Sequence, residues 1–145
     1  MENLKSVEIL LIEDNPGDAW FTQAALKGGK LRNNLHMVYD GAEASDFLFK
    51  RNQYSNAPRP DLIILDLNLP KKNGQEVLAE IKADPSLKSI PVIVLTISKA
   101  EEDIIRSYKL HANCFLNKPI DLNKFLEVVK SIEDIWLTIV KLPGL

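Results

Sequence analysis

Two short runs of this chain are apolar along their whole length, and they restrict the possible folds more than any other feature. The runs are Leu62 to Leu65 and Pro91 to Leu95. A strand with one face in water alternates polar and apolar residues, whereas a strand without alternation is covered on both faces. The two runs therefore predict central strands of a parallel sheet with helices packed on both sides.

The rest of the chain repeats the same order of strand and helix. Three further apolar runs predict the other strands, at Val7 to Ile12, Leu35 to Tyr39 and Cys114 to Leu116. Five β-α units predict an α/β, doubly wound, flavodoxin-like fold with a five-stranded parallel sheet in the order 2-1-3-4-5. No repeat or linker divides the sequence, so we expect a single domain over residues 1-145.

Polar residues mark where the helices should begin. Asn15 followed by Pro16 is typical of a helix start. Ser98 with Glu101 predicts a capping box for the fourth helix, and Asp121 should begin a long final helix. These positions follow strand ends closely, as short β-α connections require.

Charge and cysteine content exclude several classes of protein. The formal net charge is -2, so the chain has no general electrostatic attraction to nucleic acid. Its one cysteine, Cys114, rules out an internal disulfide. No segment is long and apolar enough for a signal peptide or a membrane span, so we expect a cytoplasmic protein.

Carboxylates gather where the strand order of such a fold reverses. The first predicted strand ends in Glu13 and Asp14, and the third ends in Asp66. Ligands of doubly wound folds bind beyond the carboxyl ends of the strands at this point. Three converging carboxylates would repel one another without a cation, and Mg²⁺ is the hard ion that binds both carboxylates and phosphates.

The fourth and fifth predicted strands add two more reactive groups at the same edge. Thr96 brings a hydroxyl and Lys118 an ammonium. A carboxylate can accept a phosphoryl group, and a metal with a lysine would offset the charge on its oxygens. The set predicts phosphoryl acceptance on Asp66.

These residues resemble the receiver domains of bacterial two-component response regulators, over about Val7 to Ile132. The motifs that carry the resemblance are Leu11-Ile12-Glu13-Asp14-Asn15, Leu65-Asp66-Leu67-Asn68-Leu69-Pro70 with Gly74, Val94-Leu95-Thr96 and Phe115-Leu116-Asn117-Lys118-Pro119. The resemblance implies a phosphoprotein that signals through a change in its docking surface and catalyses at most its own phosphorylation and dephosphorylation.

The resemblance also implies a role for each site residue. A partner sensor histidine kinase would phosphorylate Asp66. Mg²⁺ would be bound directly by Asp14, Asp66 and the backbone carbonyl of Asn68, with Glu13 acting through water. Lys118 would pair with the phosphoryl group, while Thr96 and Phe115 would turn inward as the switch.

Some positions depart from the family or match a part of it. Ile97 stands where the family usually has a small residue, so it should restrict access to the phosphoaspartate. His111 is expected at a helix end and is not proposed as catalytic. His36, on a predicted strand, has no evident partner and can equally be structural. A finer resemblance is to stand-alone receivers that serve phytochrome-type light-sensing kinases. It rests on Glu13 to Asp18, Leu65 to Gly74, the long loop from Gln53 to Pro60 and the C-terminal Ile135-Trp136-Leu137.

The expected last helix, about 121-142, has two apolar stripes. One stripe contains Phe125 and Val129 and is sufficient to cover the sheet. The other contains Ile132, Ile135 and Ile139, at the spacing of a helix-helix contact. An exposed stripe of this length favours a homodimer.

Three other functions fit parts of the pattern. A hydrolase of the haloacid-dehalogenase type would need an Asp two residues after the nucleophile, where this chain has Asn68. A flavin carrier of the same topology would need a phosphate-binding loop where Glu13 and Asp14 stand. An unphosphorylated, receiver-like interaction module remains the alternative, and the presence of Asp66 and Lys118 disfavours it.

Overall fold

The computed structural model describes residues 6–28, 32–96, 100, 114–117, 123–124 and 127. Its sheet has five strands in the order β2-β1-β3-β4-β5, and each neighbouring pair is parallel. The strands are β1 (Val7–Ile12), β2 (Asn33–Val38), β3 (Leu62–Asp66), β4 (Val92–Thr96) and β5 (Cys114–Asn117). The fold class and the strand order predicted from the sequence are confirmed.

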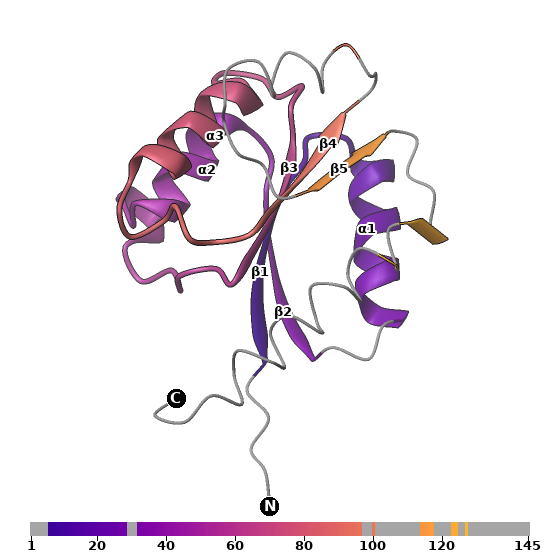
Figure 1. Cartoon of the computed structure of the whole chain (residues 1–145). Helices are drawn as coiled ribbons and strands as arrows, with labels where there is room; N and C mark the ends of the chain where they lie inside the picture. Colours follow the sequence, from indigo (N-terminus) through magenta and orange to yellow (C-terminus); the bar gives the residue numbers. More distant parts are fainter. Residues whose placement is uncertain are drawn as a thin grey trace, which may run out of the picture.

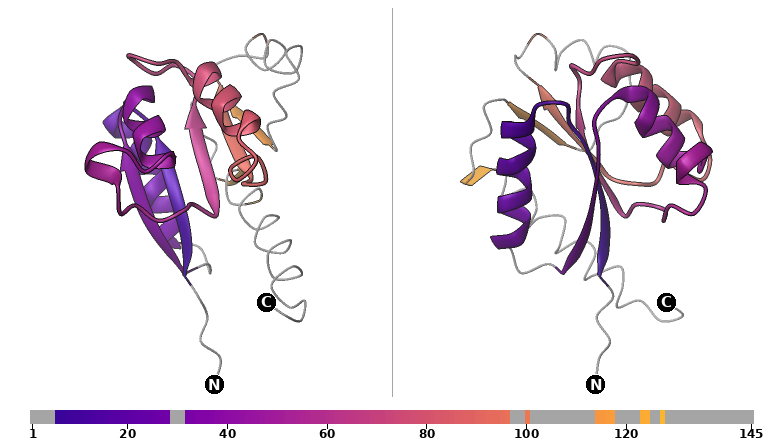
Figure 2. Two further views of the ribbon diagram at one scale, coloured as in Figure 1. Left: turned by 90° about the vertical axis from the view of Figure 1, so that its left-hand side faces the viewer. Right: turned by 180° about the vertical axis from the view of Figure 1, so that it is seen from behind.

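Helices cover both faces of the sheet. They are α1 (Pro16–Gly28), α2 (Gly41–Leu48) and α3 (Gly74–Ala83), with a short 3-10 helix, η1 (Asn52–Tyr54), after α2. Helix α1 packs on one face, while α2 and α3 lie side by side on the other (Figure 1). The same two layers are seen from behind in Figure 2.

The central strands are buried on both faces, as the apolar runs predicted. Ile9 and Leu11 of β1 pack in the core on the α1 side, and Leu10 and Ile12 pack in the core with α2 and α3. All four side chains are fully buried. Burial of one such side chain stabilises a fold by roughly 1.5–3 kcal/mol. Strand β1 therefore anchors the helices on both faces of the sheet.

The three helices α1, α2 and α3 each begin with a side-chain cap directly after a strand or loop end. The side-chain oxygens of Asn15, Asp40 and Asn73 accept a hydrogen bond from the backbone amide three residues later, at 3.0, 2.7 and 2.9 Å. Such caps satisfy an amide that the first helical turn leaves without a partner. The cap predicted at Asn15 is therefore confirmed.

Strand β2 differs from its prediction. It was expected at Leu35 to Tyr39, but it begins at Asn33 and ends at Val38. Asn33 pairs in register with Val7 of β1, so partner geometry extends the strand into residues of low strand propensity. Tyr39 lies beyond the strand and is exposed.

Several predictions fall outside the described residues. They concern the fourth helix, the final helix at 121–142, and the positions Ile97, His111 and Lys118. Within the part of the chain that the structure describes, no helix is long and apolar enough to cross a membrane.

Candidate functional site

The candidate site lies where β1 and β3 end side by side. Ile12 pairs in register with Leu65, so the next residues, Glu13 and Asp66, come from adjacent positions at the same edge of the sheet. Helix α1 leaves this edge towards one face, whereas α3 leaves it towards the other (Figure 1). The strand connections therefore diverge here and expose the carboxyl ends of both strands.

Three carboxylates meet at this edge. One oxygen each of Glu13, Asp14 and Asp66 lies within 4.8 Å of the others. Glu13 and Asp66 are almost fully buried, with 1% and 2% of their surface exposed, and Asp14 is exposed. The convergence predicted from the strand ends is confirmed by this geometry.

Backbone amides two residues downstream orient two of these carboxylates. The Asn68 amide donates to Oδ1 of Asp66 at 3.0 Å, and the Asn15 amide donates to Oε2 of Glu13 at 3.2 Å. An acidic side chain that accepts from the following turn is held by its own loop. The loops after β1 and β3 thus fix the side chains that form the cluster.

The residues fit a hard divalent cation. Buried carboxylates in mutual contact are costly unless a positive charge is close. Mg²⁺ prefers oxygen ligands and retains several waters, which suits a site with one exposed member, Asp14. Glu13, Asp14 and Asp66 would hold such an ion, together with the backbone at Asn68.

The structure describes some of the other predicted site residues fully and others only in part. The backbone of Thr96 ends β4 one residue beyond Leu95, the register partner of Asp66. Phe115 in β5 is half-buried and packs against the core on the side of α2 and α3. The side chain of Thr96 and the whole of Lys118 lie outside the described residues.

Two features of the structure were not anticipated from the sequence. Trp20 and Phe21 in α1 are 62% and 56% exposed, and their rings meet edge to face at 5.4 Å. Their position early in a helix that starts beside the acidic cluster is the signal that could have identified them. His36 was expected to lack a partner, and this was wrong because its Nε2 lies 2.7 Å from Oε1 of Glu8.

Comparison with known proteins agrees with this geometry. Residues 9–130 match the model of the response regulator receiver domain. The chain is 50% identical over 136 residues to response regulator Rcp1 of Synechocystis sp., covering 94% of this chain and 92% of Rcp1. It is 35% identical to the probable methanogenesis regulatory protein FilR2 of Methanothrix harundinacea, with 94% and 87% covered.

Solved structures show the same similarity. The phosphorylated cyanobacterial phytochrome response regulator RcpA superposes with a TM-score of 0.79 at 48% identity, covering 97% of this chain and 100% of RcpA. The Mn²⁺-bound form of Rcp1 gives a TM-score of 0.77 at 49% identity, covering 95% and 99%. With the matching domain model and the acidic site at the expected strand ends, the chain belongs to the response regulator receiver family.

Proposed function

We propose that this protein is a stand-alone response regulator that accepts a phosphoryl group on Asp66 from a sensor histidine kinase. The observation that carries the proposal is the cluster of Glu13, Asp14 and Asp66, whose oxygens lie within 4.8 Å of one another at the carboxyl edge of the sheet. Asp66 ends the central strand β3, so a buried strand fixes its position. Asp14, the next carboxylate in the cluster, is exposed, so the cluster lies at the surface of the protein.

The reaction transfers one phosphoryl group between two residues. An Asp66 carboxylate oxygen attacks the phosphorus of a phosphohistidine, a P–O bond forms, and the P–N bond to the histidine breaks. The hydrogen bond from the Asn68 backbone amide to Oδ1 of Asp66 holds the carboxylate in one orientation for this attack. Bound Mg²⁺ supplies positive charge that offsets the repulsion between the carboxylates and the incoming phosphate.

The chain's own residues would divide the remaining work. Glu13 and Asp14, with the Asn68 carbonyl, complete the ligand set of the ion. Lys118 neutralises a phosphoryl oxygen, and Thr96 with Phe115 changes position after phosphorylation, which alters the docking surface. This protein acts as a signalling protein, and its catalysis is confined to its own phosphorylation and dephosphorylation.

The kinase is proposed to be of the phytochrome type. Support comes from the similarity to RcpA, which is named a cyanobacterial phytochrome response regulator, at 48% identity over nearly the whole of both chains. The Mn²⁺-bound form of Rcp1 supports a divalent ion at the acidic site. We further place the protein in the cytoplasm as a single domain over residues 1-145, without nucleic acid or membrane partners.

The proposal includes a homodimer formed through the final helix at 121–142. Its support is the second apolar stripe, with Ile132, Ile135 and Ile139, which one helix covering its own sheet does not need. Two copies could engage a dimeric kinase together and gain from multivalency. Sedimentation across a dilution series tests this, and a protein that stays monomeric with and without phosphorylation contradicts it.

The decisive experiment is phosphorylation by a small donor followed by intact mass measurement. The unmodified protein with acetyl phosphate and Mg²⁺ should gain one phosphoryl group, and Asp66→Asn should stay folded and gain none. An unphosphorylated interaction module would gain no mass in either form. A hydrolase would release phosphate continuously, which the Asn residue two positions after Asp66 disfavours.

A further inference from the structure

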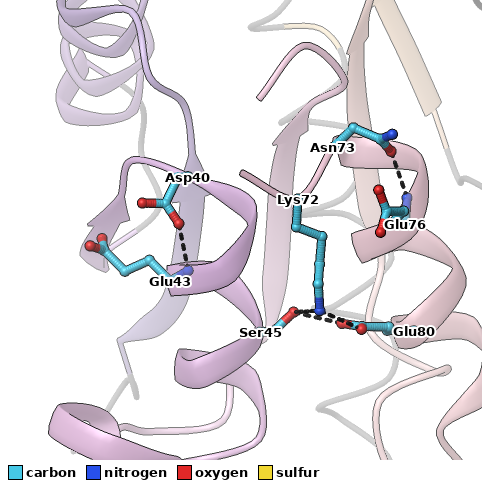
Figure 3. Close-up of polar contacts among 7 residues, drawn as sticks. All are labelled: Asp40, Glu43, Ser45, Lys72, Asn73, Glu76 and Glu80. Carbon is cyan, nitrogen blue, oxygen red and sulfur yellow. Dashed lines mark hydrogen bonds and ion pairs between the residues drawn. The ribbon is translucent and has the colours of Figure 1, made fainter. Parts of the chain in front are cut away.

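Lys72 joins the two helices on one face of the sheet. Its Nζ donates to Oε2 of Glu80 in α3 at 2.6 Å and to Oγ of Ser45 in α2 at 3.1 Å. Ser45 in turn donates to Oε1 of Glu80 at 2.6 Å, which closes a ring of three groups (Figure 3). Every member of this ring is bonded to both others, so the position of the ammonium is strongly defined.

The ring is partly buried. Ser45 is 2% exposed, and the side chains of Lys72 and Glu80 are 26% and 36% exposed. Burial by itself would raise the pKa of Glu80, but the hydrogen bonds from Lys72 and Ser45, together with the charges of Lys72 and Arg51, outweigh it and hold that pKa below its ordinary value. Glu80 is therefore charged near neutral pH, and the ion pair is partly exposed at the surface.

Lys72 does not belong to either helix, because it lies in the loop between β3 and α3. This loop begins directly after Asp66 and contains Asn68, whose amide donates to the Asp66 carboxylate. Its far end is tied back at the start of α3, where the Gly74 amide donates to the carbonyl of Leu67 at 3.0 Å. The whole loop is therefore a short closed segment that connects the acidic cluster with Lys72.

Main-chain contacts hold the same part of the loop against α2. The Gly41 amide donates to the Pro70 carbonyl at 3.3 Å, and the Lys72 amide donates to the same oxygen at 2.9 Å. Lys71 between them has a φ of 68°, a left-handed conformation that a lysine adopts only when its surroundings require it. The bond from the Lys72 amide to the Pro70 carbonyl closes a tight turn around Lys71, and the Lys72 ion pair holds the residue directly after that turn.

We propose that Lys72 is a positioning residue for the metal site: its bonds to Ser45 and Glu80 fix the β3–α3 loop, and so fix Asn68 against Asp66. The inference rests on the proposed function, because the Asn68 carbonyl is a ligand only if a cation binds at the acidic cluster. It adds to that function Lys72, a residue that is not a member of the acidic cluster and lies near the other end of the β3–α3 loop.

The sign of the effect separates this role from simple electrostatics. Replacing Lys72 with Met removes a positive charge from the neighbourhood of a cation site. If only Coulomb repulsion mattered, its loss would make the ion bind more tightly. Loss of the loop's fixed position has the opposite effect, since groups that orient metal ligands contribute to affinity. A weaker affinity in the variant is thus explained by positioning.

Lys71 offers a matched control on the same loop. Its side chain is 70% exposed and pairs with Asp40 only at 3.4 Å. Lys71→Met removes the same charge without touching the ring of Lys72, Ser45 and Glu80. Lys72→Arg restores a cation that can bond to Glu80, so it tests whether the contact is what matters.

The experiment measures Mn²⁺ affinity by electron paramagnetic resonance on the full chain. We expect Lys72→Met and Glu80→Gln to bind Mn²⁺ about tenfold more weakly, at the lower end of the effect of removing a group that orients a ligand. Lys71→Met should bind as tightly as the unmodified chain or more tightly, and Lys72→Arg should recover most of the affinity. Hydrogen exchange of the Asn68 amide, measured without metal, should be faster in Lys72→Met.

Unchanged Mn²⁺ affinity in Lys72→Met and Glu80→Gln would overturn the proposal, even if urea denaturation showed both variants to be less stable. Equal weakening by Lys71→Met would also overturn it, because the loss would then not depend on the ring of Lys72, Ser45 and Glu80. The same samples distinguish the two proposals. An unmodified chain that gains no phosphoryl mass from acetyl phosphate refutes the proposed function, whereas the comparison among variants judges Lys72.

Discussion

Gly41 and Lys72 are in such close backbone contact that no side chain fits between them. A Cβ atom placed on Gly41 would lie 1.7 Å from the Lys72 carbonyl oxygen. Lys72 and Gly41 are neighbours in space because the β3–α3 loop crosses the first residue of α2. The contact means that α2 cannot move without moving the loop that follows Asp66.

Gly41→Ala should therefore destabilise the protein by about 1–3 kcal/mol, the usual cost of forcing extra atoms into a packed region. The clash is with backbone, so no flexible side chain can move aside. Urea denaturation measures the loss. Gly17→Ala is the control, because its Cβ would lie 3.3 Å from Oδ1 of Asn15, so that side-chain atom need move by only a few tenths of an ångström. A Gly41→Ala protein as stable as the unmodified one would show that the loop adapts without cost.

Removal of the divalent ion should stop phosphorylation by acetyl phosphate. The clustered carboxylates of Glu13, Asp14 and Asp66 otherwise repel an anionic donor. Excess chelator should abolish the gain in mass, and Asp14→Ala should weaken Mn²⁺ binding by at least roughly tenfold. Asp18→Ala removes an equal charge from the first turn of α1 and should leave binding nearly unchanged. Undiminished transfer in chelator would refute a metal-dependent reaction.

Exposed aromatic residues beside the site should matter for a protein donor only. Trp20 is 62% exposed in α1, the helix that begins two residues after Asp14, so we expect a kinase that reaches Asp66 to contact it. Trp20→Ala should slow transfer from the kinase about fivefold or more, since buried tryptophans commonly contribute over 1 kcal/mol to an interface. Transfer from acetyl phosphate should be unaffected. Equal rates with the kinase would place its docking surface elsewhere.

Acid should remove a stabilising contribution of Glu8. Hydrogen bonds from Asn34 and His36 hold the pKa of Glu8 below its ordinary value of 4.5, despite an opposing effect of burial. A lowered pKa in the folded state adds stability above the unfolded value, and this stability is lost as the pH falls through the folded value. Glu8→Gln should thus be less stable than the unmodified chain near neutral pH, and the difference should shrink below about pH 4.5. A difference independent of pH would contradict this.

The fold could be predicted from the sequence where burial alone determines the structure. Leu62 to Leu65 has no polar residue on either face, so it can only be a covered strand, and the structure has β3 there. Val77, Leu78 and Ile81 recur at the spacing of one helix face, and all three are buried in α3. Convergence of Asp14 and Asp66 followed from the rule that parallel strands end at one edge.

Features that depend on distant backbone geometry were not predictable in this way. Ser45 and Lys72 are 27 residues apart, and no local pattern indicates that a loop lysine meets a helix serine. The same holds for His36 and Glu8, which meet because β1 and β2 pair in a particular register. The sequence does not distinguish the backbone amide of Asn68 from any other backbone amide. Its hydrogen bond to Asp66 can therefore be found only once the structure of the turn is known.

The two polar clusters of β1 lie at opposite ends of the strand. Glu8 makes its contacts near the start, and Glu13 joins the acidic site just after the end, five residues later, so about 16 Å of strand separate them. Substitutions at such distances usually have additive effects. Tolerance to heat and acid can accordingly evolve at one edge of the sheet while the response to a signal is tuned at the other.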